Sequence, residues 1–157
     1  MSSDLNVEII PVADLPPGAP HIEESSHRPV VLVVDDEEII ADTRVAILAG
    51  WGYAAMASYD AETALEMAGV IPPEILITDV CLTGMNGVDL AIEIQSRVAD
   101  CKVILFSGQA DNLNLVALAR NADYNFILLQ KPVHPVELLA HLTNFRPATP
   151  SVPRLSA

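Results

Sequence analysis

Four acidic residues follow directly on the first strongly apolar segment of the chain. Residues 30–38 read VVLVVDDEE, so five apolar residues run into Asp35, Asp36, Glu37 and Glu38. Like charges repel: at about 4 Å and an effective dielectric constant of about 20, one pair costs about 4 kcal/mol. Either a bound cation offsets this cost, or the acidic side chains point in different directions.

Three further polar residues stand at the ends of apolar segments. Asp79 closes EILITD, Ser107 closes KVILFS, and Lys131 follows FILLQ. If these segments are parallel strands of one sheet, their carboxyl ends meet at a single edge. A hard cation such as Mg²⁺ binds carboxylates, a carbonyl and waters. With Lys131 as a second positive charge, one carboxylate could act as a nucleophile toward a phosphoryl group.

The segments that must position these residues alternate between strands and helices. We predict strands at residues 30–34, 53–58, 74–79, 102–107 and 126–130. Among the helices, the first ends at Gly50 as its C-cap, Asp60 caps the second, and the third covers residues 88–98. Asp111 caps the fourth, and Pro135 begins the last. Five β-α units predict an α/β fold, with a parallel sheet covered by helices on both faces.

The alternating pattern is confined to the middle of the 157-residue chain. Residues 1–28 are rich in proline and acids without a regular period, which predicts a flexible leader. Residues 146–157 read as a flexible tail. Residues 29–145 are then one domain, long enough for a sizeable core.

The charge and composition exclude several classes of function. A net charge of −13 repels phosphate backbones and anionic lipids, and Lys102 and Lys131 are the only lysines. We therefore expect no nucleic-acid or membrane partner, and no apolar run is long enough to cross a bilayer. The first residues lack the basic region of a secretory signal. With only Cys81 and Cys101, a disulfide framework is not expected, which fits a cytoplasmic location.

Five short motifs occur in order at the predicted strand ends: VVDDE (33–37), ILITDV (75–80), GMNG (84–87), ILFSG (104–108) and KP (131–132). Each is weak alone, but together they resemble the receiver domain of two-component response regulators, of the stand-alone type. The resemblance covers about residues 29–145. It implies a flavodoxin-like (βα)5 three-layer sandwich with strand order 2-1-3-4-5.

The resemblance also implies a Mg²⁺ site. By position, Asp36 is expected to bind the ion directly and Asp35 mainly through water. Asp79 is expected to be both a metal ligand and the phosphoacceptor. Cys81 is expected to contribute its backbone carbonyl.

The remaining site residues would contact the phosphoryl group. The resemblance implies that Ser107 donates a hydrogen bond to it, that Lys131 pairs with it, and that the Lys131–Pro132 bond is cis.

Two positions depart from the family pattern. Thr83 stands where many members carry proline, and Leu128 stands where an aromatic residue usually moves on activation.

Each residue alone has an ordinary structural explanation. Asp36 would cap the first helix, Ser107 would be a strand-end hydroxyl, and Lys131 a surface lysine. The joint arrangement favours a phosphoacceptor site. Cys81 and Cys101 are interpreted as packing thiols rather than redox sensors.

The function predicted is that of a response regulator phosphorylated on Asp79 by a histidine kinase or a phosphotransfer protein. No output domain is expected after the last helix, so the signal would leave through protein–protein contacts with an unknown target, and homodimers are an allowed assembly. Beyond self-phosphorylation and autodephosphorylation, no enzymatic activity is expected.

Two alternatives stay open from the sequence. One is a Mg²⁺-dependent phosphohydrolase with an aspartyl-phosphate intermediate. Enzymes of the haloacid dehalogenase type carry D-x-D after the first strand, where this chain has Asp35, Asp36 and Glu37. The other is a receiver-like scaffold that acts without phosphorylation.

Overall fold

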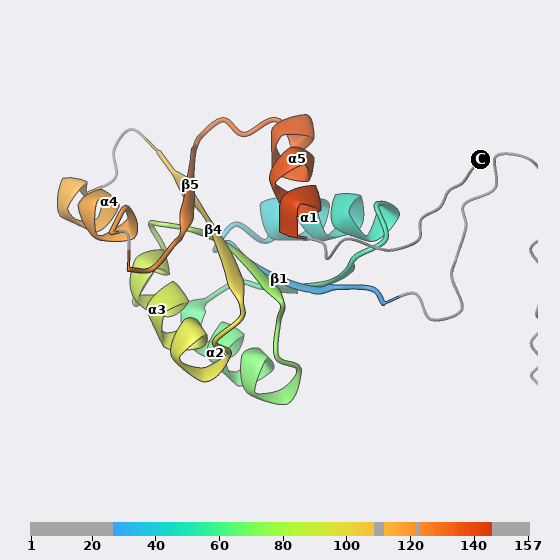
Figure 1. The fold of residues 1–157 in the computed structure, drawn as a ribbon, viewed down its shortest axis with the longest axis horizontal. Coiled ribbons are helices and arrows are strands. Elements are labelled where there is room, and N and C mark those ends of the chain that lie inside the picture. Colours follow the sequence, from blue (N-terminus) through green and yellow to red (C-terminus); the bar gives the residue numbers. More distant parts are fainter. Residues whose placement is uncertain (1–26, 109–111, 122, 146–157) are drawn as a thin grey trace, which may run out of the picture.

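The computed structural model describes residues 27–108, 112–121 and 123–145. Strands and helices alternate along this part of the chain (Figure 1). The elements are β1 (Val30–Val34), α1 (Glu38–Gly50), β2 (Ala54–Ser58), α2 (Ala61–Val70), β3 (Ile75–Asp79), α3 (Gly87–Arg97), β4 (Lys102–Ser107), α4 (Leu113–Ala119), β5 (Ile127–Gln130) and α5 (Pro135–Phe145). The predicted strands are confirmed to within one residue at each end.

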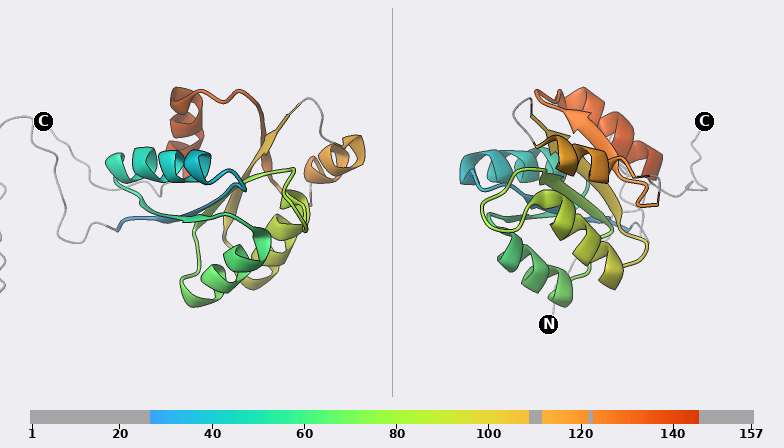
Figure 2. Two further views of the ribbon diagram at one scale, coloured as in Figure 1. Left: turned by 180° about the vertical axis from the view of Figure 1, so that it is seen from behind. Right: turned by 90° about the vertical axis from the view of Figure 1, so that its left-hand side faces the viewer.

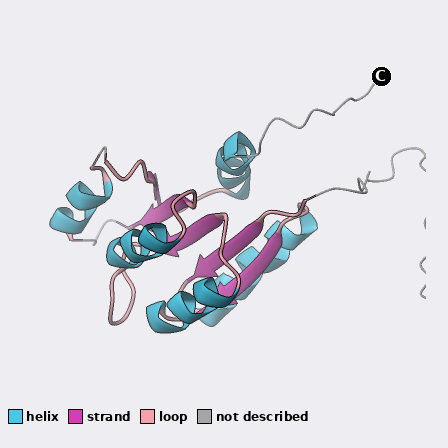
Figure 3. Ribbon diagram, turned by 60° about the horizontal axis from the view of Figure 1, so that its bottom comes forward, coloured by secondary structure: helices cyan, strands magenta, loops and turns pink. Residues whose placement is uncertain are grey.

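The five strands form one parallel sheet in the order β2-β1-β3-β4-β5. Figure 3 shows the strands side by side and pointing the same way, with helices on either side. In the centre of the sheet, Val31 of β1 pairs with Ala55 on one side and with Ile75 on the other. The predicted flavodoxin-like fold and its strand order are therefore confirmed.

Alternation along β1 divides the core into two layers. Val31 and Val33 pack with residues of α1 and α5 on one face of the sheet. Leu32 and Val34 point to the other face and pack with residues of α2, α3 and α4. Figures 1 and 2 show α1 and α5 together on one side of the sheet, with α2 and α3 on the other. Because both faces are covered, every residue of β1 after Val30 is fully buried.

The helix ends agree with the sequence patterns in part. The Asp60 side chain accepts a hydrogen bond from the Thr63 N–H at 2.7 Å, which confirms it as the cap of α2. Gly50 is not the C-cap of α1: it is the last helical residue, Trp51 follows as the cap, and the left-handed conformation falls on Gly52 (φ 97°).

The next two helices begin at other residues than predicted. The α3 helix starts at Gly87, one residue earlier, behind an Asn86 cap whose side chain accepts from the Asp89 N–H at 2.8 Å. The cap of α4 is Asn112, whose side chain accepts from the Asn114 N–H at 2.7 Å. Asp111, the predicted cap, lies outside the described residues.

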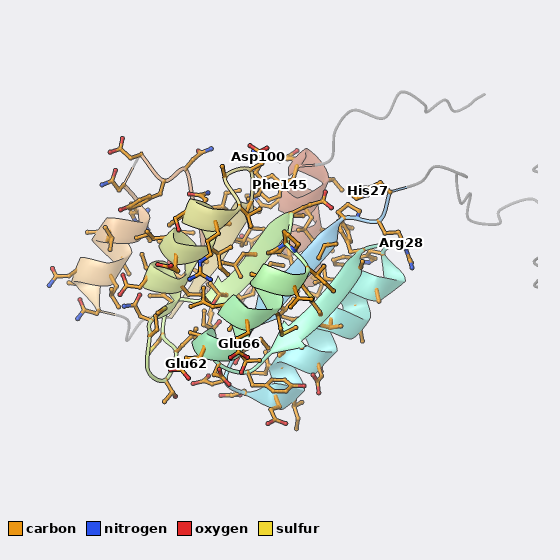
Figure 4. The ribbon with its side chains drawn as sticks, turned by 90° about the horizontal axis from the view of Figure 1, so that it is seen from below. His27, Arg28, Glu62, Glu66, Asp100 and Phe145 are labelled. Carbon is orange, nitrogen blue, oxygen red and sulfur yellow. The ribbon has the colours of Figure 1, made fainter. Side chains whose placement is uncertain are left out.

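The domain boundaries proposed from the sequence fall at the edges of the described chain. Most of the expected leader and all of the expected tail lie outside the described residues. The described chain begins with His27, whose ring nitrogen lies 2.6 Å from a carboxylate oxygen of Glu74. Figure 4 shows His27 and Arg28 at one end of the domain and Glu62 of α2 at the other. No helix in the described ranges combines the length and apolar character needed to span a membrane.

Candidate functional site

Three carboxylates meet at the carboxyl edge of the sheet. Val34 and Thr78 are partners in the parallel pairing of β1 and β3, so the residues that follow them, Asp35 and Asp79, lie side by side. One oxygen from each of Asp35, Asp36 and Asp79 lies within 4.8 Å of the others. Asp35 and Asp79 are buried, whereas Asp36 is exposed.

Two of the four acids after β1, Asp35 and Asp36, lie in the carboxylate cluster, whereas Glu37 and Glu38 are not part of it. Asp35 turns inward, and one of its oxygens accepts a hydrogen bond from the Glu37 N–H at 2.9 Å. Asp36, Glu37 and Glu38 are exposed to solvent. Glu37 occupies the cap position of α1 without a side-chain hydrogen bond, so the interpretation of Asp36 as the helix cap is wrong.

Lys131 reaches the phosphoacceptor candidate across the sheet edge. Its Nζ lies 3.1 Å from Oδ2 of Asp79, and its peptide N–H donates to the Ser107 carbonyl at 2.8 Å. The Lys131–Pro132 bond is cis, as the resemblance implied. Burial raises the pKa of Asp79 to about 6, with a further contribution from the charge of Asp35, while Lys131 acts in the opposite direction.

Ser107 ends β4, the strand next to Asp79. Its hydroxyl donates a long hydrogen bond to the Gly108 carbonyl at 3.4 Å. Ser107 also lines a cavity of about 320 Å³ together with Leu128 of β5 and Val116 of α4. The predicted phosphoryl-binding hydroxyl and the leucine that replaces the usual aromatic residue therefore border the same space.

Gly87 lies against the backbone of the candidate phosphoacceptor. A Cβ atom at Gly87 would lie 1.7 Å from the carbonyl oxygen of Asp79, a distance that no side chain can adopt. The Gly87 N–H donates to the Val80 carbonyl at 2.7 Å, which draws the start of α3 against the end of β3. The last glycine of GMNG is thus explained by a close backbone approach.

The loop after β3 also contacts Asp36. The hydroxyl of Thr83 donates to Oδ2 of Asp36 at 3.0 Å, a contact that a proline at this position could not make. From the sequence, Thr83 was identified only as a departure from the family pattern, and its contact with Asp36 was not predicted. Cys81 lies in the same loop with an exposed side chain, so its interpretation as a packing thiol is wrong. The other thiol, Cys101, is buried, and burial raises its pKa to about 12, as expected of a packing thiol.

A second cation at the site was missed by the sequence analysis. Nη1 of Arg44, on α1, lies 3.0 Å from Oδ2 of Asp35 and 3.9 Å from Oδ1 of Asp79. The guanidinium carbon lies 4.3 Å from the centre of the Phe106 ring. The available signal was that Arg44 is the single basic residue in the helix that follows the acids.

The donor set fits a hard divalent cation. Carboxylate oxygens are the ligands that Mg²⁺ prefers. Oδ1 of Asp79 is buried and has no hydrogen-bond partner within the described ranges. A buried, unpaired carboxylate oxygen is costly, and a cation bound beside Asp35 and Asp36 would satisfy it.

Fold and site together define a class of protein. The sheet order 2-1-3-4-5 places ligand sites beyond the carboxyl ends of the strands. Here that edge carries three clustered carboxylates, with a lysine bound to the central one. This combination is that of a flavodoxin-like α/β domain with an acidic pocket.

The chain belongs to the response regulator receiver domain family, whose model matches residues 31–143. Aspartate phosphorylation and Mg²⁺ binding in an acidic pocket are characteristic of this family, which acts in two-component signal transduction. Its members are generally signalling modules without enzymatic turnover.

Full-length relatives are longer than this chain. The transcriptional regulatory protein AruR of Pseudomonas aeruginosa is 33% identical over 122 residues, which are 74% of this chain and 48% of AruR. The DNA-binding response regulator MtrA of Mycobacterium tuberculosis is 26% identical over 115 residues, which are 73% of this chain and 49% of MtrA. The chain thus spans about half the length of these curated relatives.

Solved receiver structures have the same fold. The signal receiver domain of an HD domain-containing protein from Pseudomonas fluorescens superposes with a TM-score of 0.69 at 30% identity. The match covers 75% of this chain and 94% of that domain.

Proposed function

We propose that this chain accepts a phosphoryl group on Asp79 from a histidine kinase or phosphotransfer protein and passes the signal on through protein–protein contacts. The observation that carries the proposal is the 3.1 Å contact between Lys131 Nζ and Asp79 Oδ2, which joins residues 52 positions apart. A lysine held on a buried carboxylate provides a positive charge where an incoming phosphoryl group would develop negative charge.

The chemistry assigned to the site is a phosphoryl transfer. An ionised Asp79 oxygen attacks phosphorus, an O–P bond forms, and the P–N bond to the donor histidine breaks, leaving the electron pair on that histidine. Lys131 pairs with the transferred oxygens, and Ser107 donates a hydrogen bond to one of them. The pKa of about 6 leaves most of Asp79 ionised at neutral pH, as a nucleophile must be.

A divalent cation is part of the proposal. Asp35, Asp36 and Asp79, with the backbone carbonyl of Cys81, would hold Mg²⁺, which supplies charge neutralisation for the phosphoryl oxygens. The hydrogen bond from Thr83 to Asp36 supports this assignment, because it keeps the exposed carboxylate turned toward the cluster.

Chemical phosphorylation tests the proposal directly. The full chain is incubated with Mg²⁺ and acetyl phosphate or phosphoramidate, and its mass is measured intact. We expect a gain of one phosphoryl group in the natural chain and none in Asp79→Asn. Full labelling of Asp79→Asn would contradict the assignment.

The same samples separate the two alternatives from the proposal. Continuous release of product from para-nitrophenyl phosphate would favour the phosphohydrolase. A natural chain that takes up no phosphoryl group from either donor would favour the phosphorylation-independent scaffold.

A further inference from the structure

A basic side chain lies among the carboxylates proposed to bind the metal. Nη1 of Arg44 is 3.0 Å from an oxygen of Asp35 and 3.9 Å from an oxygen of Asp79. These are the two buried members of the acidic cluster. Across the described ranges, Lys131 is the other basic side chain that pairs with this cluster, and it approaches the second oxygen of Asp79.

The fold holds Arg44 in this position. Helical side chains point toward the N-terminus of their helix, so Arg44 extends back from α1 toward the end of β1. Its guanidinium lies over the Phe106 ring at 4.3 Å, and the side chain is only 19% exposed. The planar group is supported on one side by an aromatic face, and its tip donates a hydrogen bond to Asp35, with the Asp79 oxygen 3.9 Å away.

The positive charge of Arg44 therefore partly neutralises the carboxylates, as a bound cation would. Three carboxylates against Lys131 and Arg44 leave one net negative charge at the site when every group is ionised. Adding a divalent ion would leave a net positive charge and would place the ion beside the guanidinium. The two cations share the same carboxylates, Asp35 and Asp79, so binding of one disfavours binding of the other.

We propose that Arg44 is a tethered cation that competes with Mg²⁺ for Asp35 and Asp79. The inference rests on the proposed metal site and deepens it. In the metal-free protein Arg44 neutralises the acidic cluster and stabilises the fold. When Mg²⁺ binds, the guanidinium leaves the carboxylates, and the cost of breaking this pairing lowers the affinity for the metal.

Magnesium affinity of Arg44→Met in the full chain tests the proposal. Met keeps an extended side chain that packs against Phe106 but removes the charge. We expect the dissociation constant for Mg²⁺ to fall about tenfold, as expected when one unit charge is removed from within a few ångströms of the ion. Isothermal titration with MgCl2 at pH 7.5 measures it, with KCl holding the ionic strength constant.

Stability gives a second readout that does not depend on activity. Without metal, Arg44→Met should melt at a lower temperature than the natural chain, because the carboxylates lose their cation. Saturating Mg²⁺ should restore more of the melting temperature in the variant than it adds to the natural chain. Trp51, the single tryptophan, lines the same pocket as Arg44, so its fluorescence should change when Mg²⁺ displaces the guanidinium.

Arg97→Met is the matched control. It removes the same charge from an exposed i,i+4 pair with Glu93 on α3. We expect its Mg²⁺ affinity to stay within about twofold of the natural chain, since a well-screened charge contributes little. If Arg44→Met does not fold, Arg44→Gln provides a neutral variant that can still donate a hydrogen bond to Asp35, and the same gain is expected.

The outcomes distinguish the inference from the proposed function. Mg²⁺ affinity in Arg44→Met that equals that of Arg97→Met, or is weaker than that of the natural chain, overturns the competition and leaves the metal site standing. Absence of Mg²⁺ binding in the natural chain and in all variants overturns both. Tighter binding only in the position-44 variants supports both.

Discussion

The carboxylate of Asp79 is buried, so the stability of the fold depends on its protonation. Its pKa is about 6 in the fold against the ordinary 3.8, with burial as the main cause. The folded state therefore binds a proton more tightly than the unfolded chain. This contribution to the free energy of unfolding is fully present below pH 3.8 and is lost as pH rises through about 6.

Asp79→Asn should consequently stabilise the metal-free protein at neutral pH. We expect a gain of at most about 3 kcal/mol at pH 7.5, the free-energy equivalent of the pKa difference. The gain should shrink as pH falls below about 6, where Asp79 becomes protonated in the folded state, and it should be smallest below pH 3.8, where the unfolded chain is protonated as well. Urea unfolding in the presence of a chelator measures it at each pH.

Asp100→Asn is the control for this change, because it removes one carboxylate from an exposed site between α3 and β4. Its stability should follow that of the natural chain at every pH. A variant Asp79→Asn that is less stable than the natural chain at pH 7.5 would show that the pairings of Asp79 with Lys131 and Arg44 outweigh its burial.

At the scale of elements, the approach of α3 to β3 depends on one glycine. Gly87→Ala would put a Cβ atom 1.7 Å from the Asp79 carbonyl oxygen, so the helix or the strand must move. We expect a loss of at least about 3 kcal/mol, the upper end of the usual cost of overpacking. We also expect much slower labelling by acetyl phosphate, since the displaced strand end carries Asp79.

Gly69→Ala in α2 is the matched control for Gly87→Ala. A Cβ atom at Gly69 would lie within 4 Å of no other atom in the described part of the chain. This change should stabilise the protein by about 0.5–1 kcal/mol through helix propensity. Equal stabilities of the two variants in thermal unfolding would mean that the contact at Gly87 is readily relieved.

The cavity between β4, β5 and α4 is where a switch would act. Ser107 borders it, and Leu128 offers neither a ring nor a hydroxyl. A phosphoryl oxygen that draws the Ser107 hydroxyl inward should shift α4, while Leu128 only refills the space. Beryllofluoride with Mg²⁺ should therefore change amide chemical shifts over residues 108–122.

We expect Ser107→Ala to abolish most of these shift changes and Leu128→Ala to reduce them much less. Amide spectra of the three proteins with and without beryllofluoride provide the comparison. Shift changes that persist in Ser107→Ala, or that appear on another face while residues 108–122 stay unchanged, would exclude this route.

At the scale of the molecule, the two core layers are built from residues between Val31 and Leu142. Residues 1–26 and 146–157 contain few apolar residues at regular spacing, so they have little to offset their ordering entropy. A shortened chain of residues 27–146 should melt cooperatively at nearly the temperature of the full chain. A fall of more than a few degrees in calorimetry would show that the removed segments pack on the domain.

The order of elements and the parallel sheet could be predicted from the sequence by itself, and candidate site residues could be proposed from it. Five β-branched or aliphatic runs separated by helical patterns allow few arrangements, because parallel strands need crossover helices. The proximity of Asp35 and Asp79 could be predicted from the sequence, because residues that end parallel strands of one sheet lie at the same edge. Asp60 was identifiable as a cap because its hydrogen bond spans three residues.

Only the tertiary structure decided which side chains meet across that edge. The end of α1 depends on single backbone conformations: Trp51 is the C-cap, and the left-handed conformation falls on Gly52 rather than on Gly50. The contacts of Arg44 with Asp35 and of Thr83 with Asp36 depend on how α1 and the loop after β3 pack. A long side chain reaches many partners in principle, and packing selects one of them. The net charge of the acidic pocket could therefore not be predicted from the sequence, because only the fold places the Arg44 guanidinium beside Asp35 and Asp79.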